Sequence, residues 1–259
     1  MKCTFPLALT FLTVIPWPRL GEVTPQDLAR SLFWFPWVGL ILGLLYFGLG
    51  LIILEVFAPP AGAGLLLTLT VVLTRGLHLD GLADTLDGLG GGRTREARLA
   101  IMKDSRLGAF GALGLILVLL LKYTFLVALL EQGLWRGLVT VPVVSRWGLV
   151  LLASLSPYAR REGGLGQAMT EGATFPRTAG TTACTLVLVL VLGGGGAAAA
   201  VIFLSALAVW GLGHGFQKAL GGVTGDVFGA THEVLELLGL ACILIFPEFW
   251  KGIPFSRYF

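Results

Sequence analysis

Long apolar runs separated by polar segments constrain this chain more than any other feature. The runs extend over about 37–57, 61–79, 109–130, 137–156, 180–194, 197–213 and 234–247. A helix of roughly 20 apolar residues is long enough to cross the hydrocarbon core of a bilayer. The sequence therefore predicts an all-α, polytopic integral membrane helical bundle of about seven spans, with six to eight as the range.

The composition supports this class and excludes two others. Hydrophobic residues make up 56% of the 259 residues and charged residues 13%, and the mean hydropathy is +0.87. A soluble domain has a charged fraction of about 25%, so the chain is not expected to be one. The formal net charge of +3 is too small to indicate a nucleic-acid partner. We expect a single membrane domain over residues 1–259, with the lipid bilayer as its surroundings.

The N-terminal segments are shorter. Residues 3–15 are apolar but too short to span, and Pro16 and Pro18 follow them, which indicates an interfacial or re-entrant segment. Thr24-Pro25 resembles a helix N-cap followed by proline at the first helical position.

Residues 75–111, RGLHLDGLADTLDGLGGGRTREARLAIMKDSRLGAFG, carry an unusual density of charge between two apolar runs. If residues 78–88 are helical, Asp80, Asp84 and Asp87 lie at i, i+4 and i+7 on one face. Three carboxylates stacked in this way repel one another, and a cation would neutralise them. Oxygen ligands favour a hard cation, and Mg²⁺ in particular leaves room for water and phosphates. The alternative is a helix cap with surface ion pairs to the neighbouring basic residues.

Residues 157–179 and 214–233 are predicted to form two further polar loops, in addition to the charged stretch 75–108. Cytoplasmic loops are enriched in Lys and Arg, and 75–108 and 157–179 hold most of the basic loop residues. Seven spans would place the N-terminus and all three polar segments in the cytoplasm, where they could converge on one site. Lys251 and Arg257 would then lie outside, so an even number of spans stays open.

Several charged or polar side chains are candidates for chemistry. Lys122 and Arg146 fall inside predicted spans, where a charge is costly and needs a partner. For Arg146 the partner is either an anionic substrate or a helix-bound aspartate. Asp226 lies in the glycine-rich GGVTGDVFGA, which is either a phosphate-approaching turn or a plain connector. His78 and His232 adjoin these acidic groups as candidate bases, or as histidines that make one structural hydrogen bond.

Carboxylates, basic residues and glycine turns at one membrane face together indicate phosphoryl transfer. Such chemistry consists mostly of positioning and charge neutralisation by a metal and by Arg or Lys. The sequence contains neither a GxxxxGK[ST] run nor a G-x-S-x-G elbow, so it does not support an NTPase or a serine hydrolase.

These residues resemble a known family. HLDGLADTLDGLGGG followed by RLAIMKDSRLGAFG is similar to the signature of the membrane-bound cobalamin synthases, the adenosylcobinamide-GDP ribazoletransferases. The resemblance continues through FLTVIPWP, SLFWFPWVGLILG, VVSRWGLVLLASLSPYARREGGLG and GGVTGDVFGATHE, and so covers nearly the whole chain in order. The family often has a basic residue before IP, where this chain has Val14.

The resemblance implies a Mg²⁺-dependent enzyme of the bacterial inner membrane with its active site facing the cytoplasm. Its substrates would be adenosylcobinamide-GDP and α-ribazole, or α-ribazole 5′-phosphate, and GMP would be released. We hypothesise that Asp80 and Asp84 bind the metal, with Asp87 as third ligand or base. The catalytic set comprises His78, Asp87 and Asp226, and the substrate-binding set comprises Arg75, Lys103, Asp104, Arg106, Arg146 and Arg160, of which Lys103 and Arg106 would hold the diphosphate.

The sequence fits two other functions less well. A CDP-alcohol phosphotransferase also places aspartates on membrane helices, but its DGxxAR pattern fails here because Asp80-Gly81 is followed by Leu82, Ala83 and Asp84. A permease or channel would distribute charges along its spans, and no internal repeat supports one. The sequence leaves open which lower-ligand base the acceptor substrate carries, which residue acts as general base, and whether the chain forms homo-oligomers.

Overall fold

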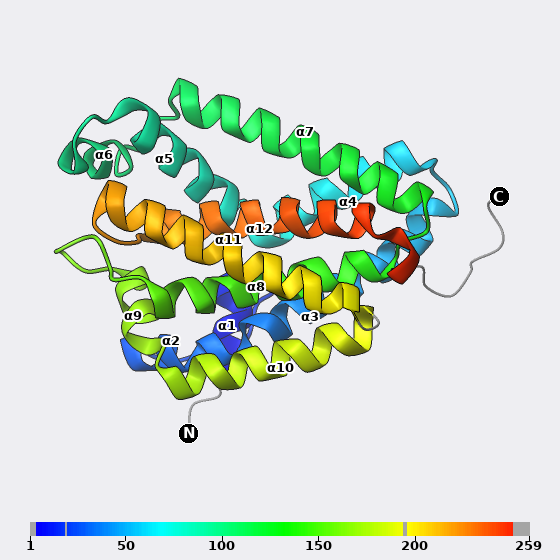
Figure 1. Ribbon diagram of the computed structural model, residues 1–259, viewed down its shortest axis with the longest axis horizontal. Coiled ribbons are helices and arrows are strands. Elements are labelled where there is room, and N and C mark those ends of the chain that lie inside the picture. The colour runs from blue at the N-terminus through cyan, green and yellow to red at the C-terminus, as the bar shows by residue number, and fades with distance from the viewer. Residues whose placement is uncertain (1–3, 19, 194–195, 251–259) are drawn as a thin grey trace.

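The computed structural model describes residues 4–18, 20–193 and 196–250, and these are almost entirely helical (Figure 1). The described ranges contain no strand, only an isolated bridge between Tyr158 and Val223. The helices are α1 (Thr4–Leu12), α2 (Pro25–Ser31), α3 (Phe35–Leu54), α4 (Pro59–Thr74), α5 (Leu77–Gly91), α6 (Arg95–Ile101), α7 (Ala109–Glu131), α8 (Arg136–Leu155), α9 (Leu165–Gly172), α10 (Phe175–Gly193), α11 (Gly196–Leu220) and α12 (Gly225–Ile245).

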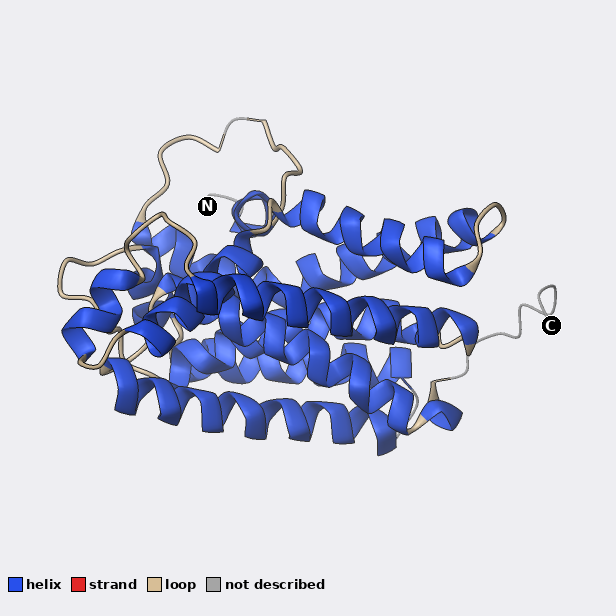
Figure 2. Ribbon diagram, turned by 90° about the horizontal axis from the view of Figure 1, so that it is seen from above, coloured by secondary structure: helices blue, strands red, loops and turns tan. Residues whose placement is uncertain are grey.

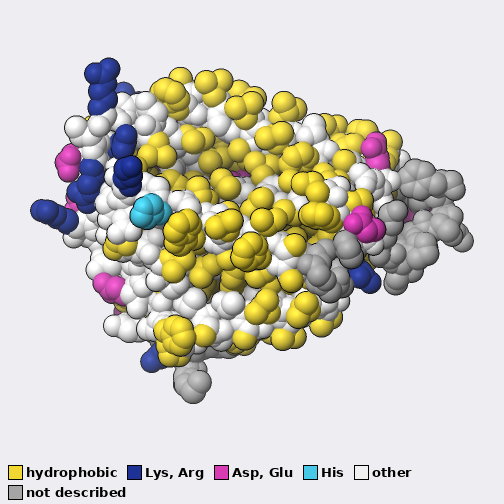
Figure 3. Space-filling model, viewed as in Figure 1, with side chains coloured by type: hydrophobic (Ala, Val, Ile, Leu, Met, Phe, Trp, Pro, Cys, Tyr) yellow, Lys and Arg dark blue, Asp and Glu magenta, His cyan; other side chains and the backbone are white. Residues whose placement is uncertain are grey.

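The protein is a multi-pass helical membrane bundle. Six described helical segments are long and apolar enough to cross a bilayer: the continuous Pro25–Leu54 segment and α7, α8, α10, α11 and α12. The long helices lie side by side along one direction (Figures 1 and 2). Hydrophobic side chains cover the middle of the visible surface, whereas Lys and Arg gather at the end where α6 lies (Figure 3). This distribution matches a belt of lipid contact with a polar end outside it.

The second predicted span, 61–79, is interrupted in the structure. α4 ends at Thr74, and α5 leaves at an angle of 86° to it. The turn is made by Arg75 and Gly76, whose φ angles are 56° and 64°. These two residues adopt the left-handed conformation that ends a helix. Counted as one bent element, α4 and α5 would make a seventh span. The bend directs α5 towards the polar end of the bundle.

The prediction that residues 157–179 and 214–233 are loops is wrong for most of their length. Residues 157–179 contain α9 and the start of α10, and residues 214–233 are helical except for 221–224. α12 begins at Gly225, so the last span is 21 residues long rather than the short 234–247. The polar side chains that suggested loops are packed against other helices. A local hydropathy average cannot distinguish such side chains from polar side chains in a loop.

Other local predictions are confirmed. Residues 77–91 form one helix that contains the whole of the predicted 78–88, and it ends at the glycine triplet with Gly92 as C-cap. Thr24 caps α2 through a capping box with Asp27, and Pro25 occupies the first turn. The short charged helix α6 follows, with Thr94 as its N-cap.

α8 is the central helix of the bundle. It packs against α3, α10, α11 and α12, and most of its residues are buried. Gly43 of α3 lies so close to α8 that an added methyl group would be 2.6 Å from Val139 Cα. Small residues permit such close packing between membrane helices, where van der Waals contact drives association.

α5 and α12 cross at a similar glycine contact, which positions the candidate site. A methyl group on Gly81 would lie 2.7 Å from the Asp226 carbonyl oxygen, and one on Gly229 would lie 2.9 Å from the His78 carbonyl oxygen. The two backbones therefore touch. This contact brings the aspartate face of α5 beside the first turn of α12.

Candidate active site

The structure brings the three polar segments together at one end of the bundle. Arg160 Nη2 donates to Asp226 Oδ2 at 2.7 Å, which joins the segment after α8 to the first turn of α12. Asp226 Oδ2 also accepts from Thr224 Oγ1, the N-cap residue of α12, at 3.2 Å. Asp226 is thereby held in a fixed orientation beside α5.

α6 is held to the same end by its arginines. Arg95 Nε donates to the Leu220 carbonyl at 2.8 Å and Nη2 to the Ala159 carbonyl at 2.7 Å. Arg98 Nη1 donates to the Ala219 carbonyl at 3.1 Å. These carbonyls include the last ones of α11, which have no partner within their own helix. α6 is therefore fixed against α11 and the segment at 157–164.

A cavity of about 420 Å³ lies between α6 and the segment after α8. Its basic lining residues are Arg95, Lys103, Arg160 and Arg161, and its acidic ones are Glu96 and Glu162. Lys103 Nζ lies 2.9 Å from Glu162 Oε2, and this hydrogen bond lowers the pKa of the Glu162 carboxyl below its ordinary value. The excess of cations makes the cavity suitable for an anionic group such as a phosphate.

The acidic face of α5 lies beside this basic cavity. Asp84 is half-buried and is repelled electrostatically by Asp226, Asp80 and Asp87, while Arg160 attracts it. Within the described ranges no hydrogen bond or ion pair engages the carboxylates of Asp80 and Asp84. Two unpaired carboxylates beside a third are a set of oxygen donors that suits a hard divalent cation. These donors are of the type that Mg²⁺ prefers, but among the described residues only His232, Glu233 and Glu236 bring three potential ligand atoms within 4.8 Å of one another.

Asp87, the third member of the predicted face, has a different environment. Its Oδ2 accepts from the backbone N–H of Gly108 at 2.7 Å, and its Oδ1 accepts from Gly111 at 2.8 Å. Both donors belong to the N-terminal end of α7, which has unpaired N–H groups. Asp87 thus fixes α7 against α5. Both of its carboxylate oxygens are already hydrogen-bonded, so a metal ligand or a base at this position would have to act while keeping these bonds.

His78 lies at the inner edge of the site. It lines a second cavity, of about 170 Å³, together with Asp80 and Asp226. The side chain is buried, and Nε2 has no hydrogen-bond partner among the described residues. Its ring stacks on that of His232, with centroids 3.7 Å apart and an interplanar angle of 20°.

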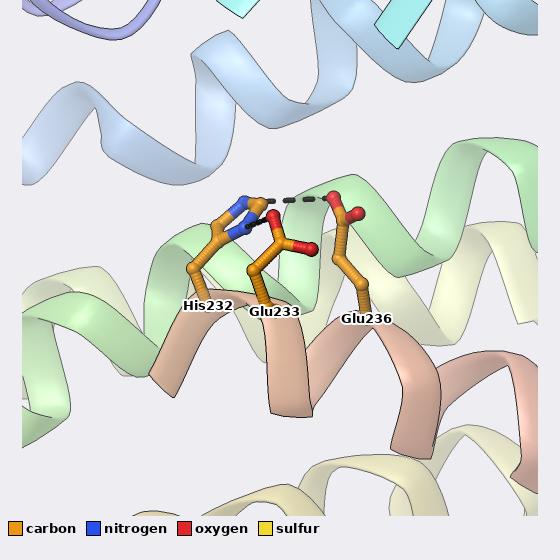
Figure 4. A group of neighbouring side chains, drawn as sticks. All are labelled: His232, Glu233 and Glu236. Carbon is orange, nitrogen blue, oxygen red and sulfur yellow. Dashed lines mark ion pairs between the residues drawn. The ribbon is translucent and has the colours of Figure 1, made fainter. Parts of the chain in front are cut away.

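Behind the histidines lies a buried charge network in the bundle interior. Lys122 Nζ lies 2.5 Å from Glu233 Oε2 and 2.6 Å from Glu236 Oε2. His232 lies beside the two glutamates, with Nδ1 3.6 Å from Glu233 Oε1 and Nε2 3.5 Å from Glu236 Oε1 (Figure 4). The ligand atoms of the three side chains in Figure 4 lie close enough together to hold a metal ion. The Lys122 ammonium, however, already pairs with the two glutamates. Lys122 thus has the partners that its place in a span requires.

Arg146 belongs to the same network. Its side chain is 0% exposed, and Nη1 lies 3.7 Å from Glu236 Oε1 and 3.1 Å from the Pro142 carbonyl. The internal partner is a glutamate, not the aspartate considered from the sequence. Arg146 would have to leave this pair in order to contact a substrate.

The remaining predicted residues lie at the surface. Arg106 is 87% exposed and pairs with Asp104 at 2.5 Å. Hydrogen bonds from Arg106 lower the pKa of the Asp104 carboxyl to about 2. Arg75 is exposed at the bend between α4 and α5. Neither Arg75 nor Arg106 lines the cavity that contains Lys103 and Arg160.

Sequence reasoning missed several side chains at this end of the bundle. Glu162 pairs with Lys103 and Arg95 bonds to Ala159, across separations of 59 and 64 residues. Arg161 lines the basic cavity. The basic pair Arg160-Arg161 was visible in the sequence, but the partners of this segment depend on a contact between distant parts of the chain.

A family model described as cobalamin-5-phosphate synthase matches residues 4–244. The chain belongs to this family. The adenosylcobinamide-GDP ribazoletransferase of Syntrophobacter fumaroxidans is 44% identical over 243 residues, which are 92% of this chain and 96% of that protein. Two proteins of the same name, from Chlorobium phaeobacteroides and Pseudomonas fluorescens, are 42% and 44% identical; the matches cover 89% and 92% of this chain and 93% and 98% of the relatives. No solved structure matches the chain significantly.

Proposed function

We propose that this protein is an adenosylcobinamide-GDP ribazoletransferase, which joins adenosylcobinamide-GDP to α-ribazole or its 5′-phosphate and releases GMP. Membership of the cobalamin-5-phosphate synthase family supports the reaction. The observation that carries the proposal is the position of the unpaired Asp80 and Asp84, next to Arg160 and the basic cavity. A diphosphate needs cations on its oxygens, and this end of the bundle supplies them.

The proposed cofactor is Mg²⁺, held by Asp80 and Asp84. Bound there, the ion would neutralise charge on the diphosphate oxygens. Asp226 contributes a third carboxylate from α12, oriented by Arg160 and Thr224. Asp87 acts mainly by fixing α7 against α5, through its two backbone hydrogen bonds.

The chain's own residues bind and orient the reactants. Lys103 and Arg160 line the basic cavity and would hold the diphosphate of adenosylcobinamide-GDP. A ribose hydroxyl of α-ribazole attacks the phosphorus next to cobinamide, the bridging P–O bond breaks, and GMP departs with the bond's electrons. The hydroxyl proton goes to His78 Nε2, which has no other hydrogen-bond partner among the described residues.

We further propose that the protein resides in the bacterial inner membrane with this end facing the cytoplasm. Lys and Arg side chains gather there (Figure 3). Arg93, Lys103 and Arg161, which adjoin α6 and α8 in the chain, are exposed. Cytoplasmic segments of membrane proteins carry such an excess of Lys and Arg. A nucleotide substrate would reach the site from the cytoplasm, where nucleotides are made.

Purified protein incubated with adenosylcobinamide-GDP, α-ribazole and Mg²⁺ tests the proposal. We expect stoichiometric GMP and the joined corrinoid, and loss of both on chelation of the metal. Because disturbing a metal site's supporting partners alone costs about 10–100-fold, Asp84→Asn should lower kcat/KM by about 100-fold or more. Glu131→Gln, at an exposed position at the C-terminal end of α7, is the control and should keep full activity. Release of CMP from a CDP-alcohol, without GMP formation, would refute the assignment.

A further inference from the structure

The cavity that His78, Asp80 and Asp226 share has walls unlike those of the basic cavity. Apart from these three residues and glycines, its lining is apolar: Phe11 and Leu12 of α1, Leu77 of α5, Leu149 of α8, Leu165 and Met169 of α9, and Phe228 of α12. Leu12, Leu149 and Met169 are 1 to 3% exposed, whereas Leu165 is 65% exposed and lies at the open side. The cavity is therefore an apolar pocket whose polar groups are the acidic end of the candidate active site.

Its size limits what can enter. The volume is about 170 Å³, whereas sites for whole drug-sized ligands have about 300–1,000 Å³. A corrin ring does not fit, and neither does a complete nucleotide. One flat bicyclic ring does. Gly166, Gly225 and Gly229 line the pocket as well, and residues without a side chain leave room for a planar group against the backbone.

The position of the pocket relative to the basic cavity indicates which substrate places a ring there. Asp226 lines the apolar pocket and Arg160 lines the basic cavity, and these two side chains are paired at 2.7 Å. The carboxylates thus stand between an apolar compartment and a cationic one. In a transfer from a diphosphate to a ribose hydroxyl, the diphosphate belongs on the cationic side. The nucleoside that carries the hydroxyl belongs on the other side.

The chemistry of the walls separates the two candidate bases. Guanine has a polar edge of donors and acceptors, and burying such groups without partners costs about 1–3 kcal/mol each. The apolar walls offer none, and Asp226 is already engaged by Arg160 and Thr224. The two other polar groups of the lining, Asp80 and His78, are assigned by the proposed function to the metal and to the hydroxyl proton. The base of α-ribazole is a dimethylated benzimidazole, which is flat, apolar and without exocyclic donors. It matches the pocket.

We propose that this pocket binds the benzimidazole base of the acceptor nucleoside and thereby directs a ribose hydroxyl at the polar end formed by His78, Asp80 and Asp226. This inference rests on the proposed transferase function. The side chain of Leu165 then limits the size of the base, because it lies at the open side of the pocket. The residues on the closed side, Leu149 and Met169, set its depth.

A size series at Leu165 tests the proposal. Leu165→Trp narrows the pocket, and since the residue is exposed the larger side chain does not overpack the core. We expect the KM for α-ribazole to rise at least tenfold, while the KM for adenosylcobinamide-GDP changes less than twofold. Leu113→Trp on α7, at a leucine of similar exposure (59%), is the matched control and should change neither constant. Leu165→Ala, which shortens an exposed side chain, should accept the riboside of a larger tricyclic base better than wild type does.

Binding of free dimethylbenzimidazole, measured by equilibrium dialysis of the purified full-length protein, separates this inference from the proposed function. We expect wild type and Leu113→Trp to bind it and Leu165→Trp to bind it at least tenfold more weakly. If dimethylbenzimidazole binds in this way but no GMP is formed, the transferase proposal fails and the pocket assignment stands. A selective rise in the KM for adenosylcobinamide-GDP would show that the pocket takes guanine. Absence of dimethylbenzimidazole binding by wild type would show that another group, such as a lipid chain, fills it; either result overturns the inference.

Discussion

The replacement Lys122→Met would test how far the buried charge network stabilises the bundle. Lys122 is 5% exposed and makes two short ion pairs, with Glu233 and Glu236. Arg146 is the second cation, 3.7 Å from Glu236. The four charges therefore balance, two against two. Methionine retains the length of the lysine stem but leaves two carboxylates with one guanidinium in the interior of a membrane bundle.

Removing one partner of a buried ion pair costs about 3–5 kcal/mol, because the other charge stays buried without compensation. Polar contacts between membrane helices alone average only about 0.6 kcal/mol, so most of the cost here comes from the unbalanced carboxylates. We expect Lys122→Met to lower the free energy of unfolding by about 3–5 kcal/mol. Adding Glu233→Gln to Lys122→Met leaves the observed pair of Arg146 and Glu236 balanced. The double variant should be more stable than the sum of the single effects predicts, by about 0.5–3 kcal/mol.

The assay is denaturant-induced unfolding in mixed micelles, followed by circular dichroism of the helices. Lys218→Met, at an exposed position near the end of α11, controls for loss of a lysine as such and should change the free energy of unfolding by less than about 0.5 kcal/mol. The reasoning is refuted if Lys122→Met matches Lys218→Met. It is also refuted if the two substitutions in the double variant add without coupling.

Two further predictions concern the polar end. Gly81→Ala places a methyl group 2.7 Å from the Asp226 carbonyl oxygen, so α5 and α12 must separate. We expect the free energy of unfolding to fall by about 1–3 kcal/mol and GMP release to decrease. The control is Gly48→Ala, where an added methyl group meets nothing within 4 Å; equal effects of the two substitutions would contradict the close contact. Arg106→Gln should raise the pKa of the Asp104 carboxyl from about 2 towards its ordinary 3.8. The ion pair is intact above the ordinary pKa and is lost as the pH falls towards 2, so a carbon-13 titration of the aspartates should show the shift, and an unchanged midpoint would disprove the pairing.

The sequence by itself determined the class of the protein and the local elements of the site. Hydropathy is a sum over neighbouring residues, and backbone hydrogen bonds in a helix join residues four apart, so both can be read locally. For the same reason the helix at Leu77–Gly91 and its aspartate spacing were predictable, as was the cap at Thr24. The motifs at Asp80–Asp87 and Lys103–Arg106 were sufficient to indicate the family, which the comparisons show.

Only the tertiary structure decided which charges meet. The pairs Arg160–Asp226 and Lys122–Glu236 span 66 and 114 residues, and Asp87 bonds to the N-terminal end of the helix that follows. An aspartate's position on a helix face gives its direction but not its partner. The partner depends on how the helices cross, and here glycine contacts between α5 and α12 fix that crossing. Such a contact cannot be predicted from local sequence, because it stabilises the protein only when both helices are already packed together.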